Sequence, residues 1–483
     1  MKLNELFEGL PEIEIKHLFS DSRKKREDSI FFCIKGMMFD GHKFVDQAID
    51  NGAIVVVHSE EIENKRDNVT YIKVKDVLGV FNIVADKFYG EPSHKMRMFG
   101  VTGTNGKSST ASIIKDLYNE FHDCGYIGTI DIEYGSVKLP ALLTTPDIDD
   151  LHGILSEMYD AGMKACALEA SSMGIEQRRI DSIDFDVAIF TNLTHEHLDY
   201  HGTMQNYFLA KKKFFDDLKE DAVAITNVDD PYGMQIVKDT KAKVVTYGID
   251  NDADYRITEY QLLKNKTRFK LEFGSRSYEL ETNLVAKFNI YNLLGALVAL
   301  IESGLAIEDI QPFLSDIHQI SGRMHRVDDG QPFNIIVDYA HTPDGIEKLG
   351  QFASAITPKD KRIIVVLGSA GKRDKTKRPI MGEVLDKYCD MIILTDEDSR
   401  NEDPYVIAEE IAQGIHKTNY VIIVDRYDAI RQAIEMAEPN DLVMVLGKGD
   451  ERFMDEEFGS EDWIGDINAC HDILKKYYFT EEE

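Results

Sequence analysis

The segment 96–110 constrains the fold more than any other part of the chain, because an apolar run leads directly into a glycine-rich loop and a helical pattern. The loop ends in Gly106-Lys107-Ser108. Between a strand and a helix, such a loop offers backbone N–H groups to phosphate, while Lys107 supplies positive charge and Ser108 a hydroxyl for Mg²⁺. The general Walker pattern requires glycine where Val101 stands, so the strict match fails. We therefore expect a phosphate-binding unit in an α/β sheet, with a turn that only caps a helix as the alternative.

Length and composition indicate several domains. A chain of 483 residues exceeds one core, since domains average about 100–200 residues. Its 86 acidic and 55 basic side chains give a net charge of −31, which repels nucleic acid and anionic membranes over most of the surface. The five cysteines are scattered without disulfide or metal-site spacing, as in a reduced compartment. With neither a signal peptide nor an apolar stretch of about 18 residues, we expect a cytoplasmic protein with no membrane span and no nucleic-acid partner.

The apolar runs divide the chain into three α/β units, expected at 1–92, 93–320 and 321–483. Helix-length segments separate the runs, which is typical of mainly parallel sheets, and the third unit is predicted to be a Rossmann-like, doubly wound domain. An alternating pattern at 255–284 predicts an antiparallel side sheet, followed by a helix at 289–303. The expected buried strands are 30–34, 53–57 and 70–74 in the first unit, 165–170, 185–191 and 222–227 in the second, and 334–337, 362–367, 391–395, 421–424 and 442–446 in the third.

Polar residues directly after the central strands are candidates for chemistry, because ligands gather at the carboxyl ends of parallel strands. Glu169 can offer a carboxylate to a divalent cation near the phosphate loop, or act as a helix cap. His195, His197 and His201 follow the next strand. Such spacing occurs in zinc sites, but a cysteine or a well-placed fourth ligand is lacking, so we favour one imidazole assisting Mg²⁺. Lys211, on the helix that follows, is expected to point inward.

The third unit carries charged or glycine-rich loops after four of its expected strands. These loops occupy residues 337–344, 368–374, 395–400 and 447–451. A single loop of this kind carries little information. Four of them on one edge of one sheet predict a ligand site there.

In this order, the loops resemble those of the Mur ligase family, and most closely its MurE branch, whose members add the third residue of the peptidoglycan stem peptide. The likeness runs over essentially the whole chain. Residues 21–23 and 40–44 are similar to the family's uridine-nucleotide domain, in which the resemblance implies contacts by Ser22 and His42. Residues 102–108 match the family's own phosphate loop, which explains the failed Walker spacing. The resemblance implies a small nucleotide domain, a central ATP-binding domain and a C-terminal amino-acid-binding domain.

The resemblance distributes the candidate residues over several subsites. For ATP it implies Gly103, Thr104, Asn105, Gly106, Lys107, Ser108, Ser109, Asn289, Asn292, Arg323, Asp338 and His341. For the UDP-MurNAc-peptide it implies Ser22, His42, Thr144, Thr145, Ser171, Gln177 and Arg179, and for the incoming amino acid Arg373, Asp398, Arg400, Gly447 and Glu451. For Mg²⁺ it implies Ser108, Glu169, His197 and Lys211, the last carbamylated by CO₂ to an N6-carboxylysine. The implied catalytic set is Lys107, Glu169, His197, Lys211 and Arg323.

The sequence departs from the family pattern at positions that bear on activity and specificity. The departures are Met173 for His, Glu196 for Asp and Ala286 for Gly, together with Glu397-Asp398-Ser399-Arg400 for the diaminopimelate signature Asp-Asn-Pro-Arg. Arg400 still suits a distal carboxylate, as meso-diaminopimelate requires. Asp398 adds a negative charge that also suits the ammonium group of lysine. We favour meso-diaminopimelate and keep L-lysine as the second candidate.

The resemblance implies an ATP-dependent ligase that forms an acyl phosphate on UDP-MurNAc-L-Ala-D-Glu and joins it to a diamino acid, with small molecules as its partners. We expect Mg²⁺ to offset the repulsion between anions and the domains to close about a hinge near Ser321. A monomer is expected. Two alternatives stay open: a folylpolyglutamate synthetase-like ligase, which the uridine-type first unit disfavours, and a non-catalytic nucleotide-binding regulator, which the retained catalytic set disfavours.

Overall fold

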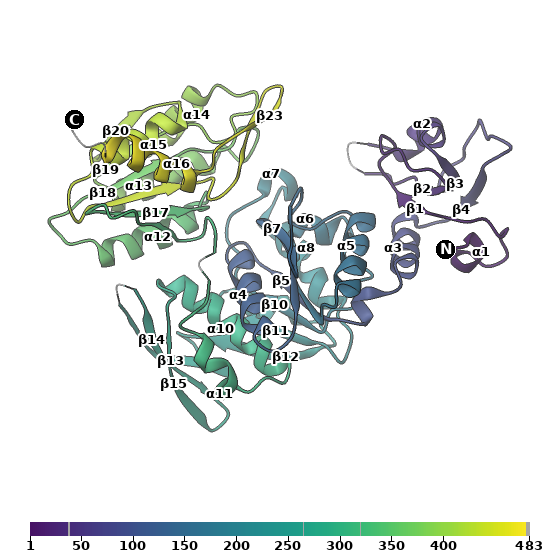
Figure 1. Ribbon diagram of the computed structural model, residues 1–483, viewed down its shortest axis with the longest axis horizontal. Coiled ribbons are helices and arrows are strands. Elements are labelled where there is room, and N and C mark those ends of the chain that lie inside the picture. Colours follow the sequence, from purple (N-terminus) through teal and green to yellow (C-terminus); the bar gives the residue numbers. More distant parts are fainter. Residues whose placement is uncertain (37–38, 264, 319, 480–483) are drawn as a thin grey trace.

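The computed structural model describes residues 1–36, 39–263, 265–318 and 320–479 and consists of three α/β domains in succession (Figure 1). The N-terminal domain contains a parallel four-stranded sheet of order β1-β2-β3-β4. Helix α3 packs against this sheet through Phe81, which stacks on Phe32. The elements are α1 (Leu3–Leu6), β1 (His17–Phe19), β2 (Ser29–Phe32), α2 (Val45–Asp50), β3 (Ala53–His58), β4 (Thr70–Lys73) and α3 (Val77–Phe88).

The central domain is built on one eleven-stranded sheet of order β15-β14-β13-β12-β11-β10-β5-β9-β6-β7-β8. Its strands are β5 (Arg97–Thr102), β6 (Cys124–Ile127), β7 (Asp131–Tyr134), β8 (Val137–Pro140), β9 (Ala165–Glu169), β10 (Val187–Phe190), β11 (Val223–Asn227), β12 (Lys243–Gly248), β13 (Tyr255–Leu262), β14 (Thr267–Phe273) and β15 (Arg276–Thr282). Its helices are α4 (Lys107–Asn119), α5 (Ile148–Asp160), α6 (Ser172–Glu176), α7 (Leu198–His201), α8 (Met204–Asp216), α9 (Gly233–Ile236), α10 (Lys287–Glu302) and α11 (Ile307–Ile310).

Apolar strands explain why this sheet is covered on both faces. One core cluster joins the sheet to α4 and α10, and a second joins it to α5 and α8. A parallel sheet buried on both faces reads as continuous apolar runs, as the sequence predicted. The antiparallel side sheet β13-β14-β15 is not separate. It continues the main sheet, because β13 pairs in parallel with β12 at Tyr247–Tyr255 and Gly248–Arg256, and it packs against α10 and α11, which lie beside it in Figure 1.

The C-terminal domain has a six-stranded sheet of order β16-β17-β21-β18-β19-β20, parallel except for β16 at one edge. Helices α12, α13 and α14 cover one face, and α15 and α16 the other. The elements are β16 (His325–Val327), β17 (Asn334–Asp338), α12 (Pro343–Ile356), β18 (Ile363–Leu367), α13 (Lys377–Tyr388), β19 (Met391–Leu394), α14 (Pro404–Ala412), β20 (Asn419–Ile422), α15 (Arg426–Glu435), β21 (Leu442–Leu446) and α16 (Asp466–Ile473). A two-stranded hairpin, β22 (Phe453–Glu456) and β23 (Gly459–Asp462), follows β21.

This doubly wound arrangement confirms the predicted fold class. The loops at the carboxyl ends of β17 and β18 and the segment before β16 meet loops of the central domain, since Asp344, Asp374 and Arg323 contact Asn105, His195 and Ser108 respectively. Across the described ranges, no helix has both the length and the apolar character needed to cross a membrane.

Candidate active site

The phosphate loop turns sharply between β5 and α4, and its glycines have a steric reason. Gly103 and Gly106 have φ of 151° and 88°. A Cβ atom would lie 1.9 Å from the Thr191 hydroxyl at Gly103 and 2.3 Å from the Asn292 carboxamide at Gly106. The first-turn N–H groups of any helix lack intrahelical partners. Gly106, which precedes α4, has no side chain to cap them. These N–H groups border a cavity of about 690 Å³, where an anion is the natural ligand.

Three cationic side chains converge on this loop. Lys107 Nζ donates to the Gly103 and Thr104 carbonyls at 3.1 and 2.9 Å, and Lys211 Nζ donates to the same Gly103 carbonyl at 2.8 Å. Arg323 reaches across from the C-terminal domain to Ser108 Oγ at 3.3 Å and stacks on the Tyr339 ring. Burial lowers the pKa of Lys107. Burial and the neighbouring Lys107 charge together hold the pKa of Lys211 well below its usual range.

Glu169 lies directly behind Ser108 rather than in the cavity wall. Its carboxylate is fully buried and accepts hydrogen bonds from Ser108 Oγ at 3.0 Å, the Tyr126 hydroxyl at 2.6 Å and the Thr129 amide at 2.9 Å. The Thr129 hydroxyl also donates to it at 3.3 Å, so four donors fix the acid in place. Ser108, whose hydroxyl donates to Glu169, lines the cavity itself.

The groups around the loop are of the types that hold a divalent cation. Ser108 lines the cavity with its hydroxyl oxygen, which donates to Glu169 behind it, and one oxygen of Glu196 is buried without a hydrogen-bond partner among the described residues. His197 lines the cavity, and burial together with the charges of Lys107 and Lys211 lowers its pKa well below the usual value. Its ring is therefore neutral and has a lone pair to offer. Hard oxygen ligands with one imidazole suit Mg²⁺.

Two of the three neighbouring histidines bond to separate partners, which is not the geometry of a zinc site. His195 bonds to Asp374 at 2.8 Å, and His201 bonds to Ser172 at 2.9 Å. In the described part of the chain, only one cluster has ligand atoms close enough for a metal, and it consists of Asp40, His42 and Glu60. There His42 Nδ1 pairs with Asp40, while Nε2 accepts from the Ser59 and Glu60 amides at 3.1 and 3.2 Å. Both ring nitrogens are already used.

The predicted nucleotide residues of α10 and the C-terminal domain line the same cavity. Asn289 and Asn292 lie near the start of α10, joined by a 3.3 Å hydrogen bond. Asp338 accepts from the Met324 and Ala340 amides at 2.7 and 2.8 Å, so this acid organises the backbone next to Arg323. Burial lowers the pKa of His341 to about 4 and raises that of Asp338.

The residues predicted to hold the peptide end of the substrate form a network beside the cavity. Thr144 and Ser171 line it, and Thr145 lies behind them, bonded to Ser171 Oγ at 3.0 Å. Arg179 donates to the Thr145 carbonyl at 2.7 Å and to Gln177 at 2.5 Å. Ser22 and His42 lie instead in the N-terminal domain, outside this cavity; Ser22 Oγ donates to Gln47 at 2.9 Å.

The predicted amino-acid residues surround the carboxyl ends of β19 and β21, outside the cavity wall. Lys448 pairs with Asp398 at 2.8 Å and with Glu451 at 2.6 Å. Gly447 has φ of 108°, and a Cβ there would lie 2.1 Å from a Glu397 carboxylate oxygen. The Tyr339 hydroxyl donates to Glu451 at 3.0 Å, which links this cluster to Arg323.

Three ion pairs form an interdomain clasp around His197. They join residues that flank it to the loop after β18, and they are His195–Asp374 at 2.8 Å, Glu196–Lys377 at 3.5 Å and Asp199–Arg373 at 3.5 Å. Arg373, predicted for the amino acid, therefore pairs across the domain boundary. In the Glu196–Lys377 and Asp199–Arg373 pairs the central domain contributes the acid and the C-terminal domain the base. The pairing fixes which loop of one domain faces which loop of the other.

Two residues that sequence reasoning did not select also shape the cavity. Asn192 holds the phosphate loop, because its side chain accepts from the Asn105 amide at 3.0 Å and donates to the Asn105 carbonyl at 2.9 Å. Asp344, from the C-terminal domain, accepts from the Asn105 side chain at 2.8 Å. The position of Asn192 directly after a buried strand was a usable signal. Asp344 ends the 337–344 loop, which the sequence marked as a whole without selecting this residue.

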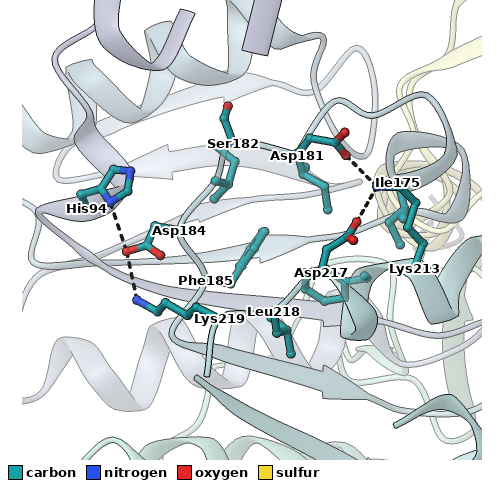
Figure 2. Close-up of a pocket in the computed structure, with 13 residues that line it drawn as sticks. His94, Ile175, Asp181, Ser182, Asp184, Phe185, Lys213, Asp217, Leu218 and Lys219 are labelled. Atoms are coloured by element: carbon teal, nitrogen blue, oxygen red, sulfur yellow. Dashed lines mark hydrogen bonds and ion pairs between the residues drawn. The ribbon is translucent and has the colours of Figure 1, made fainter. Parts of the chain in front are cut away.

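A second, smaller pocket of about 220 Å³ lies beside the C-terminal end of α8 and contains none of the predicted residues (Figure 2). Its charged groups neutralise one another. Lys213 pairs with Asp181 and Asp217, and Lys219 pairs with Asp184 at 3.0 Å. With its charges satisfied internally, this pocket offers no polar group aimed at a ligand.

Comparisons with known proteins agree with this geometry along the whole chain. Residues 14–89 match the family description "Mur ligase family, catalytic domain", 101–300 match "Mur ligase middle domain", and 322–449 match "Mur ligase, glutamate ligase domain". The UDP-N-acetylmuramoyl-L-alanyl-D-glutamate--2,6-diaminopimelate ligase of Halalkalibacterium halodurans is 38% identical over 452 residues, which are 93% of this chain and 92% of that protein.

Solved structures give the same result. A structure of a UDP-N-acetylmuramoyl-L-alanyl-D-glutamate--2,6-diaminopimelate ligase is 27% identical and superposes with a TM-score of 0.69, covering 99% of this chain and 100% of that one. Folylpolyglutamate synthase from Mycobacterium tuberculosis shares the fold with a TM-score of 0.64 at 16% identity, covering 77% of this chain and 92% of that chain. The phosphate loop, the converging cations and these similarities lead to one conclusion: the chain belongs to the Mur ligase family.

Proposed function

We propose that this chain joins 2,6-diaminopimelate to UDP-N-acetylmuramoyl-L-alanyl-D-glutamate in an ATP-dependent reaction of peptidoglycan synthesis. The observation that carries the proposal is the cavity in which Lys107, Lys211 and Arg323 converge from two domains on one glycine-rich loop. The names of the relatives supply the substrate class. L-Lysine is the second candidate for the amino acid.

The reaction proceeds in two steps. First, the D-glutamyl side-chain carboxylate attacks the γ-phosphoryl group of ATP, so that an acyl phosphate forms and ADP leaves. The amine of the amino acid then attacks the acyl carbon, an amide bond forms, inorganic phosphate leaves and the amine loses a proton. The difficulty of the first step is the approach of one anion to another.

The residues around the phosphate loop address that difficulty. Lys107, Arg323 and the first-turn N–H groups of α4 present positive charge to the phosphates, in a buried setting where each contact is stronger than in water. Asn289, Asn292, Asp338 and His341 are assigned to the nucleotide side. When bound by Ser108, Glu169 and His197, Mg²⁺ supplies charge neutralisation for the transferring phosphoryl group.

Lys211 is proposed to carry a carbamate. An uncharged amine adds to CO₂ with loss of one proton, and the lowered pKa of Lys211 favours that uncharged form. The side chain lies over the Tyr207 ring and is almost fully buried, which protects a carbamate from bulk water. The product is an anion that the Lys107 charge attracts, whereas the same charge repels the ammonium form of Lys211.

The peptide end of the nucleotide substrate is assigned to Thr144, Thr145, Ser171, Gln177 and Arg179, and its uridine end to Ser22 and His42. The amino acid is assigned to Arg373, Asp398, Arg400, Gly447 and Glu451. We keep the domain limits 1–92, 93–320 and 321–483 as part of the proposal. We also propose a cytoplasmic monomer, with the scattered cysteines as the support for a reducing compartment.

One experiment tests the proposal against its rivals. The purified chain is incubated with ATP, Mg²⁺ and UDP-MurNAc-L-Ala-D-Glu. Separate reactions contain either meso-diaminopimelate or L-lysine, and a further reaction contains folate and glutamate instead. Phosphate release is measured in each reaction. Release that depends on both the nucleotide peptide and a diamino acid supports the proposal. Release only with folate and glutamate supports the folylpolyglutamate synthetase alternative, and no release under any condition supports the regulator.

A further inference from the structure

The guanidinium group of Arg400 already faces a carboxylate of this chain. Arg400 Nη2 lies 3.2 Å from Asp455 Oδ2, and Nη1 donates to the Gly371 carbonyl at 2.6 Å. Asp455 belongs to the β22–β23 hairpin, a separate two-stranded sheet that is rich in acidic residues. Arg400, which is assigned to the distal carboxylate of the amino-acid substrate, is thus already paired with Asp455 of the same chain.

The backbone holds Asp455 in this place. The Arg400 amide donates to the Asp455 carbonyl at 2.9 Å, and the Asp455 amide donates to the Asp398 carboxylate at 2.9 Å. Lys448 fixes the same Asp398 oxygen at 2.8 Å. The hairpin is therefore docked on the 398–400 segment by main-chain bonds that do not depend on the charge of Asp455.

The second oxygen of Asp455 is also held, since it accepts from Ser460 Oγ at 2.5 Å. Burial opposes ionisation of this acid, but the Ser460 hydrogen bond and the Arg400 charge prevail and lower the pKa of Asp455. A second acid, Glu456, accepts from Ser399 Oγ at 3.1 Å. The surroundings of Arg400 are consequently anionic, and they disfavour the entry of another carboxylate.

We propose that Asp455 is a specificity-determining residue that competes with the distal carboxylate of the amino acid for Arg400. Diaminopimelate must displace Asp455 to reach Arg400, whereas L-lysine, which lacks that carboxylate, leaves the ion pair intact. Asp455 therefore reduces any preference in KM for diaminopimelate over L-lysine. This inference rests on the proposed function, because it requires that the pocket accepts a diamino acid.

The test compares Asp455→Asn with the unchanged chain. Asparagine keeps the size, the backbone bonds and an acceptor for Ser460, and removes only the charge that competes. Glu461→Gln, on the opposite strand of the same hairpin and exposed, is the matched control. KM and kcat are measured by phosphate release with meso-diaminopimelate and with L-lysine.

We expect KM for diaminopimelate to fall about fivefold in Asp455→Asn, the equivalent of a partly exposed ion pair, with KM for lysine and both kcat values unchanged. An unchanged KM for diaminopimelate overturns the inference, and so does a rise, which would show that Asp455 only positions Arg400. If the unchanged chain releases no phosphate with any amino acid, the proposed function fails. In that case the affinities of the unchanged chain and of Asp455→Asn for the two amino acids are measured by calorimetry. The inference is overturned if both proteins bind diaminopimelate with equal affinity, or if neither binds it.

Discussion

Lys107 offers the sharpest test of the proposed phosphoryl transfer. Its Nζ makes hydrogen bonds only to two loop carbonyls, which remain part of the loop when the side chain is shortened. Loss of one preorganised cationic donor at a developing charge costs about 3 kcal/mol, which is on the order of a hundredfold to a thousandfold in kcat. We therefore expect Lys107→Met, which keeps most of the volume, to reduce phosphate release by about that factor.

The same substitution is expected to leave the fold intact. Removal of Lys107 takes out a charge that burial disfavours, and among the described residues it breaks hydrogen bonds only within the loop. The melting temperature should stay the same or rise, and it is compared directly because a three-domain chain does not guarantee two-state unfolding. Lys115→Ala is the control, since Lys115 lies on the same helix but pairs with Glu133. A loss of kcat below tenfold in Lys107→Met would refute the role of Lys107.

Three further predictions concern the loop, the carbamate and the C-terminal core. Lys211→Ala should reduce kcat at least a hundredfold, and removal of dissolved CO₂ should lower the activity of the unchanged chain until bicarbonate is added back. Gly106→Ala should abolish ATP binding measured by calorimetry, because the added Cβ meets the Asn292 side chain at 2.3 Å. Asp466→Asn should lower the unfolding free energy by about 3–5 kcal/mol in denaturant titration, since it leaves the fully buried Arg426 guanidinium without its bidentate partner at 2.6 and 2.8 Å.

Each of these has a clear contrary outcome. Activity that is indifferent to CO₂ would remove the carbamate from Lys211. Unchanged ATP affinity in Gly106→Ala would mean that the loop does not approach the nucleotide closely. A loss below 1 kcal/mol in Asp466→Asn would show that water reaches the Arg426 site. The last variant is designed to affect stability, so its kcat at low temperature should be unchanged and serves as its control.

The sequence allowed prediction of the elements whose identity rests on local pattern. The strand, loop and helix around Lys107 were predicted because glycine and apolar residues have one consistent arrangement there. Strand β20 is observed at Asn419–Ile422 instead of the expected 421–424. It is an exposed edge strand, so pairing with β19 sets its limits rather than burial. The β22–β23 hairpin was missed because its charged residues give no apolar alternation.

The site was predictable to a similar degree and for the same reason. Residues such as Glu169 and His197 follow buried strands, so topology alone placed them near the phosphate loop. Lys211 points inward, as its helical position predicted. The pairing of His195 with Asp374 could not be predicted, because these residues are 179 positions apart and meet only through the orientation of two domains. The Asp455 contact depends likewise on the docking of a hairpin.

The interdomain clasp has a consequence for anyone who recombines members of this family. Because the loop around His197 and the loop around Asp374 carry matched charges, the C-terminal domain is not a freely exchangeable module. If a chimaera takes this domain from a relative whose charges differ at these positions, side chains of like charge face one another across the domain boundary. Exchange of both loops together restores the match, so the natural unit for transplanting specificity is the domain plus the facing strip of its neighbour.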